Sequence, residues 1–347
     1  IFTEFMEQRA PGHTVADGKI YQQGFLDLQQ KIKEKIASLD YQQDCQAYQK
    51  LNQLKAMSIC AEAIIALAGR YARLAKEKAE KEVDVQRKNE LLTISEICQW
   101  VPAHAPRTFQ EALQMYWFVH IGVISELNTW DSFNPGHLDQ HLLPFYRKDL
   151  QSGELNREKA KELLGCYWIK FNNQPAPPKV GVTLAESGTY TDFANINNGG
   201  LTPDGRDAVN EVTYLLLEVI DEMQLLQPST NIQLSQKSPD QFLKRACEVI
   251  RKGWGQPSVF NTDLVVDELL RQGKSIRDAR EGGTSGCVET GAFGKEAYIL
   301  TGYFNLVKVL EVTLNNGQDP ATGKMIGIST GDPRTFTGFD QLFEAFK

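Results

Sequence analysis

One cysteine lies in an unusually glycine-rich stretch of the chain. Residues 282–296 read GGTSGCVETGAFGKE, so Cys287 and Glu289 stand two residues apart among five glycines. Glycine lets a backbone bend sharply and approach a ligand closely. Side chains two residues apart in an extended segment point to the same side. The stretch therefore predicts a loop that presents one thiol and one carboxylic acid to a common cavity.

Three familiar motifs do not fit this stretch. A phosphate-binding P-loop needs Ser or Thr where this chain has Glu296. The nucleophile elbow G-x-S-x-G fails because Cys287 stands in place of its second glycine. A cysteine hydrolase needs a thiolate and a histidine base, but no histidine follows Cys287 and the nearest one before it is His141. The neighbouring carboxylate also disfavours a thiolate.

A neutral thiol that transfers a hydrogen atom fits the stretch better. A thiyl radical needs no stabilisation of charge. It needs a water-poor pocket, close placement against a C–H bond and an acid or base beside it, which Cys287 and Glu289 would provide. The simpler alternative is a buried cysteine without a chemical role, but that alternative leaves the concentration of glycines unexplained.

The composition excludes several classes of protein. The chain has 347 residues, 41% of them apolar, and a net charge of −7, which disfavours a nucleic-acid partner. Its six cysteines are widely spaced without a C-x-x-C pair, which disfavours a zinc site and favours reduced thiols in the cytoplasm. No uninterrupted apolar run approaches the ~20 residues that a membrane helix needs, so no membrane association is predicted.

Helical and extended patterns alternate along the chain. Apolar residues at steps of three and four predict helices over residues 25–39, 42–82, 106–127, 156–171, 205–226 and 238–255. Strand-like runs cover residues 179–186, 229–236 and 256–263. This alternation predicts an α/β fold with helices outside and binding residues at strand ends. The five cysteines other than Cys287 lie near helical patterns and are expected to be packed.

The cysteine stretch resembles the corresponding loop of glycyl radical enzymes, the family of pyruvate formate-lyase and the radical dehydratases. The resemblance rests on residues 282–317 with their specific G-C-V-E core, and extends to residues 4–15, 106–118 and 126–146. It covers essentially the whole chain. Glycerol-, diol- and choline-type members carry Pro after C-V-E, where this chain has Thr290. Within the family, the chain is most similar to members that dehydrate hydroxyproline.

The resemblance implies a ten-stranded α/β barrel enclosed by helices, with Cys287 on an internal loop. Residues 1–347 are expected to be part of a single large catalytic domain. In this family a C-terminal loop with an R-V-x-G-like signature carries the glycyl radical, and this sequence contains no such signature. We therefore expect the C-terminal glycyl radical domain to be absent from it, as in a piece of a longer protein.

The implied reaction removes water from trans-4-hydroxy-L-proline and gives 1-pyrroline-5-carboxylate. By the same resemblance, Cys287 would take a hydrogen atom from the ring carbon beside nitrogen. Glu289 would act as base toward the ring nitrogen, and His13 would protonate the departing hydroxyl. Asp192 is a further candidate in the reaction. A histidine in a turn or in the core is an equal alternative for His13.

The resemblance also implies a pocket for a small zwitterion. Asp131 and Asp192 would hold the ring ammonium or the hydroxyl, Ser187 would bind the carboxylate, and Phe5, Phe193 and Tyr303 would wall the ring. By residue type alone, the aspartates and the serine could be turn residues and the three aromatic residues could be core residues. The histidines at 104, 120, 137 and 141 have no recognisable ligand spacing and are expected to be structural.

Several partners follow from the resemblance. No cofactor is expected in this chain itself, because a radical S-adenosylmethionine activase would install the glycyl radical. A homodimer in an anaerobic cytoplasm is expected. The alternatives are another glycyl radical lyase (a glycerol or diol dehydratase, a C–N lyase or an arylacetate decarboxylase), a non-radical protein that binds small molecules on the same fold, and a cysteine hydrolase.

Overall fold

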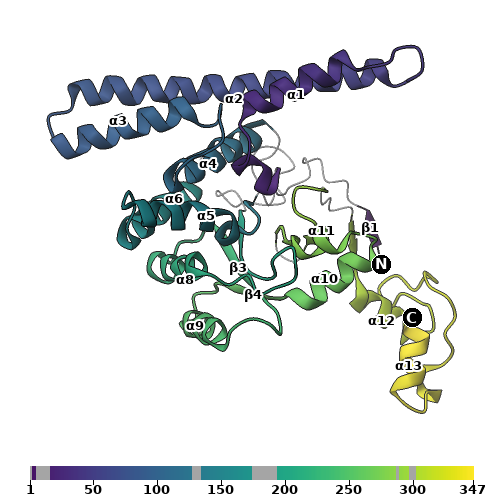
Figure 1. The fold of residues 1–347 in the computed structure, drawn as a ribbon. Helices are drawn as coiled ribbons and strands as arrows, with labels where there is room; N and C mark the ends of the chain where they lie inside the picture. The colour runs from purple at the N-terminus through teal and green to yellow at the C-terminus, as the bar shows by residue number, and fades with distance from the viewer. Residues whose placement is uncertain (1, 5–15, 127–133, 174–193, 287–288, 297–301) are drawn as a thin grey trace. The chain divides into compact units, whose positions relative to one another are not determined.

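The computed structural model describes residues 2–4, 16–126, 134–173, 194–286, 289–296 and 302–347 (Figure 1). The chain divides into two compact units. Residues 9–298 form the larger unit, and residues 1–8 and 299–347 form the smaller one.

Helices make up most of the larger unit. They are α1 (Phe25–Ala37), α2 (Ala47–Lys81), α3 (Val85–Trp100), α4 (Phe109–Glu126), α5 (Leu138–Ser152), α6 (Arg157–Asn172), α8 (Glu211–Met223), α9 (Asp240–Ile250), α10 (Thr262–Arg271) and α11 (Ile276–Arg280), after a 3₁₀ turn at Asp17–Tyr21. All six predicted helices are present. Asn156 caps α6 by accepting a hydrogen bond from the Lys159 amide at 2.8 Å, which satisfies one of the free donors at its start.

A parallel sheet lies among these helices. Strands β2 (Asn195–Gly199), β3 (Ser229–Leu234) and β4 (Ser258–Asn261) pair side by side in that order, with α8 and α9 as the connections between them. Predicted strands 229–236 and 256–263 are confirmed, whereas the predicted strand 179–186 lies outside the described residues. Strand β2 was not predicted, because its sequence NINNG has a single large apolar residue, Ile196, where a buried parallel strand usually shows a near-continuous apolar run.

The two faces of this sheet differ in chemistry. Side chains alternate between the faces along a strand, so Ile196 and Ile232 share the hydrophobic core with residues of α4, α6 and α8 such as Phe109, Phe171 and Leu216. Asn195 and Asn197 of β2 lie on the opposite face, which is polar. The helices therefore cover one side of the sheet, and the polar side is left for the site.

Helices α1, α2 and α3 extend from the larger unit as a long helical layer (Figure 1). Ala68 and Ala72 of α2 are buried with Cys98 and Phe118 in a separate small core. Among the described residues, α2 is the single helix that is long and apolar enough to cross a membrane by length and composition. No uninterrupted apolar run marks this helix in the sequence, because charged residues such as Glu62 and Arg70 separate its apolar residues.

The smaller unit contains a short antiparallel pair and two helices. Strand β1 (Phe2–Glu4) pairs with β7 (Gly302–Phe304), so that Thr3 stands opposite Tyr303, and α12 (Leu306–Thr313) and α13 (Phe339–Phe346) follow.

The expectation that five cysteines are packed is wrong for four of them. Cys98 is buried, but Cys45, Cys60, Cys166 and Cys247 are exposed. A helical pattern alone does not determine which face of a helix is covered.

Candidate active site

The cysteine stretch folds into a tight hairpin within the larger unit. Strand β5 (Gly283–Thr284) pairs antiparallel with β6 (Thr290–Gly291), and the Ser285 amide donates to the Glu289 carbonyl at 2.8 Å. Cys287 and Val288 stand between these strands in the sequence and lie outside the described residues. Residues 282–286 are all buried. The predicted tight loop is therefore confirmed on the residues that flank the cysteine.

Close packing explains the glycines before the cysteine. A Cβ atom on Gly283 would lie 2.6 Å from Gln233 Nε2, 2.7 Å from Phe293 Cζ and 2.8 Å from Asn197 Oδ1. A Cβ atom on Gly282 would lie 2.6 Å from a backbone carbonyl oxygen of β6. Real Cβ atoms do not approach so closely. Glycine is needed at position 282 because the opposite strand of the hairpin lies so close, and at position 283 because the hairpin lies directly against side chains of the sheet.

Carboxamide side chains of the polar sheet face bind the hairpin backbone. Asn197 Oδ1 accepts from the Thr284 amide at 3.1 Å, and Asn197 Nδ2 donates to the Thr284 carbonyl at 2.8 Å. Asn195 Nδ2 donates to the Gly286 carbonyl at 2.8 Å, and Asn134 Nδ2 donates to the Ser285 carbonyl at 3.4 Å. Sequence reasoning missed these residues. For Asn195 and Asn197 the signal was a cluster of asparagines in a segment where an α/β fold expects a buried strand; Asn134 lies outside this cluster.

Several polar atoms around the hairpin are buried without a hydrogen-bond partner. They are Thr284 Oγ1, Ser285 Oγ, both polar side-chain atoms of Asn231 and His137 Nδ1. A buried polar atom without a partner is unfavourable by about 1–3 kcal/mol unless water or a ligand satisfies it. These atoms can therefore bind water or a polar ligand beside the cysteine loop.

Two histidines support the same region from α5 and its N-cap. His137 Nε2 lies 2.9 Å from the Gly282 carbonyl oxygen, and burial lowers the pKa of His137 to about 4. At neutral pH this imidazole is uncharged and donates its Nε2 proton to the hairpin. His141 Nε2 lies 2.8 Å from Asp17 Oδ1. Burial opposes the charge on both side chains, but their mutual attraction lowers the pKa of Asp17 and raises the pKa of His141.

Most of the predicted site residues lie outside the described residues. These are Phe5, His13, Asp131, Ser187, Asp192, Phe193 and Cys287. Glu289 is half-buried at the end of the hairpin turn. Tyr303 is described only by its backbone, in β7 of the smaller unit. The proximity of these residues to one another therefore stays a prediction.

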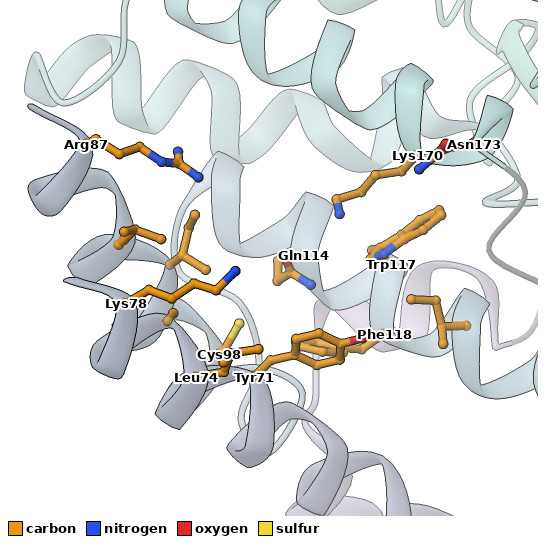
Figure 2. A pocket seen from close by; sticks show the side chains of 14 residues that line it. Tyr71, Leu74, Lys78, Arg87, Cys98, Gln114, Trp117, Phe118, Lys170 and Asn173 are labelled. Carbon is orange, nitrogen blue, oxygen red and sulfur yellow. The ribbon is translucent and has the colours of Figure 1, made fainter. Parts of the chain in front are cut away.

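A separate cavity of about 510 Å³ opens between α2, α3, α4 and α6 (Figure 2). Lys78 of α2 and Arg87 of α3 point into it from one side, and Lys170 of α6 points into it from the side of Trp117. It contains no residue of the cysteine hairpin and no predicted site residue. Across the described part of the chain, no three His, Cys, Asp or Glu side chains are arranged to hold a metal ion.

The whole chain, residues 1–347, matches the family described as pyruvate formate lyase-like. The chain belongs to this family. This confirms the family predicted from the cysteine loop.

Individual relatives refine this assignment. The chain is 61% identical over 347 residues to trans-4-hydroxy-L-proline dehydratase of Clostridioides difficile, which covers 100% of this chain and 44% of the relative. The crystal structure of hydroxyproline dehydratase from that organism, with substrate bound, has a TM-score of 0.90 at 61% identity, over 99% of this chain and 44% of that chain.

A glycerol-bound, B12-independent glycerol dehydratase from Clostridium butyricum is also similar. Its TM-score is 0.84 at 34% identity, and the match covers 97% of this chain and 42% of that chain. The α/β fold class is thereby confirmed. The chain spans less than half the length of these relatives.

Proposed function

We propose that these residues form the catalytic core of a glycyl radical dehydratase that converts trans-4-hydroxy-L-proline to 1-pyrroline-5-carboxylate and water. The observation that carries the proposal is the 61% identity over all 347 residues with an enzyme named for this dehydration. The TM-score of 0.90 to a hydroxyproline dehydratase with bound substrate supports it. A glycerol or diol dehydratase is less well supported, at 34% identity.

The described residues suit a cysteine that works as a radical. The strand before the cysteine is buried and the hairpin is tight. Hydrogen bonds such as that from Asn197 to the Thr284 carbonyl join the hairpin to the sheet. A protein-based glycyl radical, when present, supplies the oxidation of the Cys287 thiol to a thiyl. The 347 residues contain no R-V-x-G-like segment, so we place that glycine elsewhere in a longer protein.

In the proposed reaction, the Cys287 sulfur takes a hydrogen atom from the ring carbon beside nitrogen, so that an S–H bond forms as a C–H bond breaks. Glu289 takes a proton from the ring nitrogen, and His13 gives a proton to the hydroxyl on the adjacent carbon. The C–O bond then breaks and water leaves. The product radical takes the hydrogen atom back from Cys287, which restores the thiyl. The net change is the loss of one water molecule.

The remaining predicted residues would bind the substrate. Asp131 and Asp192 would hold the ring ammonium or hydroxyl, and Ser187 would bind the carboxylate. Phe5, Phe193 and Tyr303 would wall the apolar ring. A few fixed polar groups in an apolar pocket are typical of small-molecule sites.

Activation and assembly belong to the same proposal. A radical S-adenosylmethionine activase would install the glycyl radical, and a homodimer in an anaerobic cytoplasm would be the working form. Residues 1–347 would be part of one large catalytic domain.

The test uses the complete protein, activated anaerobically and incubated with trans-4-hydroxy-L-proline. We expect 1-pyrroline-5-carboxylate together with the electron paramagnetic resonance signal of a glycyl radical. Cys287→Ser should abolish turnover and keep that signal. Turnover of glycerol without turnover of hydroxyproline would reassign the enzyme within the family. Absence of the radical signal after activation would favour a non-radical binding protein.

A further inference from the structure

We propose that Asn197 and Asn195 are positioning residues that clamp the backbone leading to Cys287 and so fix where its sulfur stands. This inference deepens the proposed function and rests on Cys287 being the hydrogen-atom carrier. It concerns residues 195, 197 and 282–286, all of which belong to the larger unit.

Asn197 binds the hairpin as a neighbouring strand would. Its Oδ1 accepts from the Thr284 N–H and its Nδ2 donates to the Thr284 C=O, at 3.1 and 2.8 Å. One carboxamide thus satisfies both backbone groups of the same residue, three positions before Cys287. An aspartate offers only acceptors, so it would place a carboxylate oxygen against the Thr284 carbonyl. The geometry therefore requires an amide.

Asn195 binds the hairpin closer to the cysteine. Its Nδ2 donates to the carbonyl of Gly286, the residue immediately before Cys287, at 2.8 Å, with a longer contact of 3.4 Å to the Thr284 carbonyl. Two carboxamides on the same face of β2 therefore hold two points of the chain just ahead of the thiol.

The clamp is itself held by the sheet. Gln233 Nε2 of β3 donates to Asn197 Oδ1 at 2.6 Å, and Asn197 stands opposite Asn231 in the parallel register. Asn195 is 2% exposed, and Asn197 and Gln233 are 0% exposed. These side chains therefore have little freedom to turn away from the hairpin.

Such a clamp matters for hydrogen-atom transfer because the reaction depends on short range. The sulfur must stand in contact with one C–H bond, and a displacement of about 1 Å can lower a rate by ~100-fold. The glycine-rich hairpin provides little rigidity of its own, because glycine has the largest conformational freedom of all residues. The buried amides of β2 supply the rigidity that the loop lacks.

The test compares Asn197→Asp with Asn210→Asp in the complete, unactivated protein. Asn210 caps α8 by accepting from Val212 N and Thr213 N, and Asp is an equally good cap. The control thus makes the same chemical change on a neighbouring element without touching the hairpin. We expect N197D to accelerate hydrogen exchange at the Thr284 amide and alkylation of Cys287 by roughly tenfold or more, with N210D unchanged.

A second measurement distinguishes positioning from a purely structural role. In the activated enzyme, N197D should keep the yield of glycyl radical, lower kcat by roughly tenfold, leave KM within about twofold and raise the deuterium isotope effect for substrate labelled at the carbon beside nitrogen. If N197D does not fold, Asn195→Asp is measured in the same way, against the same control.

Exchange and alkylation rates in N197D equal to those in N210D would overturn the clamp, as would an unchanged kcat and isotope effect. These two rates involve no substrate. Failure of the unmodified enzyme to dehydrate hydroxyproline would refute the proposed function, whereas the exchange and alkylation rates would still decide the clamp.

Discussion

Asp139 joins three elements behind the cysteine hairpin, and its replacement gives a sharp test of the buried polar network. The side chain is 0% exposed. Its Oδ2 accepts from the Gly199 amide of β2 at 2.7 Å and from the Thr213 hydroxyl of α8 at 2.6 Å, while Oδ1 accepts from the Gln140 amide of α5 at 2.9 Å. Burial raises the pKa of Asp139 to about 6, against the pull of these hydrogen bonds.

The raised pKa fixes the sign of the pH dependence. A carboxyl group with a folded pKa near 6 and an unfolded value near 3.8 binds more protons in the folded state between those values. The wild-type protein therefore loses stability as pH rises from 3.8 through 6. This loss reaches about 3 kcal/mol at pH 8, of which roughly 1.4 kcal/mol arises between pH 5 and pH 8.

Asp139→Asn removes this titration and keeps an oxygen for Gly199 and Thr213. From pH 5 to pH 8, the unfolding free energy of D139N should therefore rise by roughly 1.4 kcal/mol relative to that of the wild-type protein. Asp139→Ala leaves the Gly199 amide and the Thr213 hydroxyl without their acceptor, so it should destabilise by about 2–5 kcal/mol.

The assay is urea unfolding of the complete protein at pH 5 and pH 8, followed by tryptophan fluorescence. Asp267→Asn, at an exposed position, controls for the loss of one negative charge. A difference between D139N and wild type that stays constant with pH, or moves the other way, would refute the raised pKa and the reasoning from burial.

Three further predictions use the same unfolding assay. Gly283→Ala should destabilise by about 1–3 kcal/mol, since its Cβ would meet three side-chain atoms within 2.8 Å, whereas Gly69→Ala inside α2, whose Cβ would meet only Arg73 Nη1 at 3.9 Å, should not destabilise. Leu216→Ala should destabilise by about 2–5 kcal/mol, because Leu216 is fully buried in the main core; a smaller loss would mean that the site is loosely packed. Wild type should lose about 2 kcal/mol relative to His137→Gln between pH 7 and pH 5, since the pKa of His137 is lowered to about 4; parallel pH profiles would contradict this.

The sequence by itself determined six of the twelve α-helices among the described residues, two strands of the sheet and the cysteine loop. Periodic apolar residues and caps such as Asn156 act locally, so they can be read without the rest of the chain. The glycines around Cys287 likewise indicated a tight turn before any contact was known. Helix α5 was missed as an element by the same local reasoning, since Pro144 lies inside it.

Only the tertiary structure decided how the hairpin is held. Strand β2 reads as a polar segment, because one of its faces meets the backbone of the cysteine hairpin rather than other side chains. Asn197 and Thr284 are 87 residues apart, and no local pattern connects them. Likewise, burial of Asp139 and His137 sets their pKa values, and burial is a property of the packed molecule. Local chemistry predicted a reactive Cys287 beside Glu289, and packing determined what surrounds the hairpin.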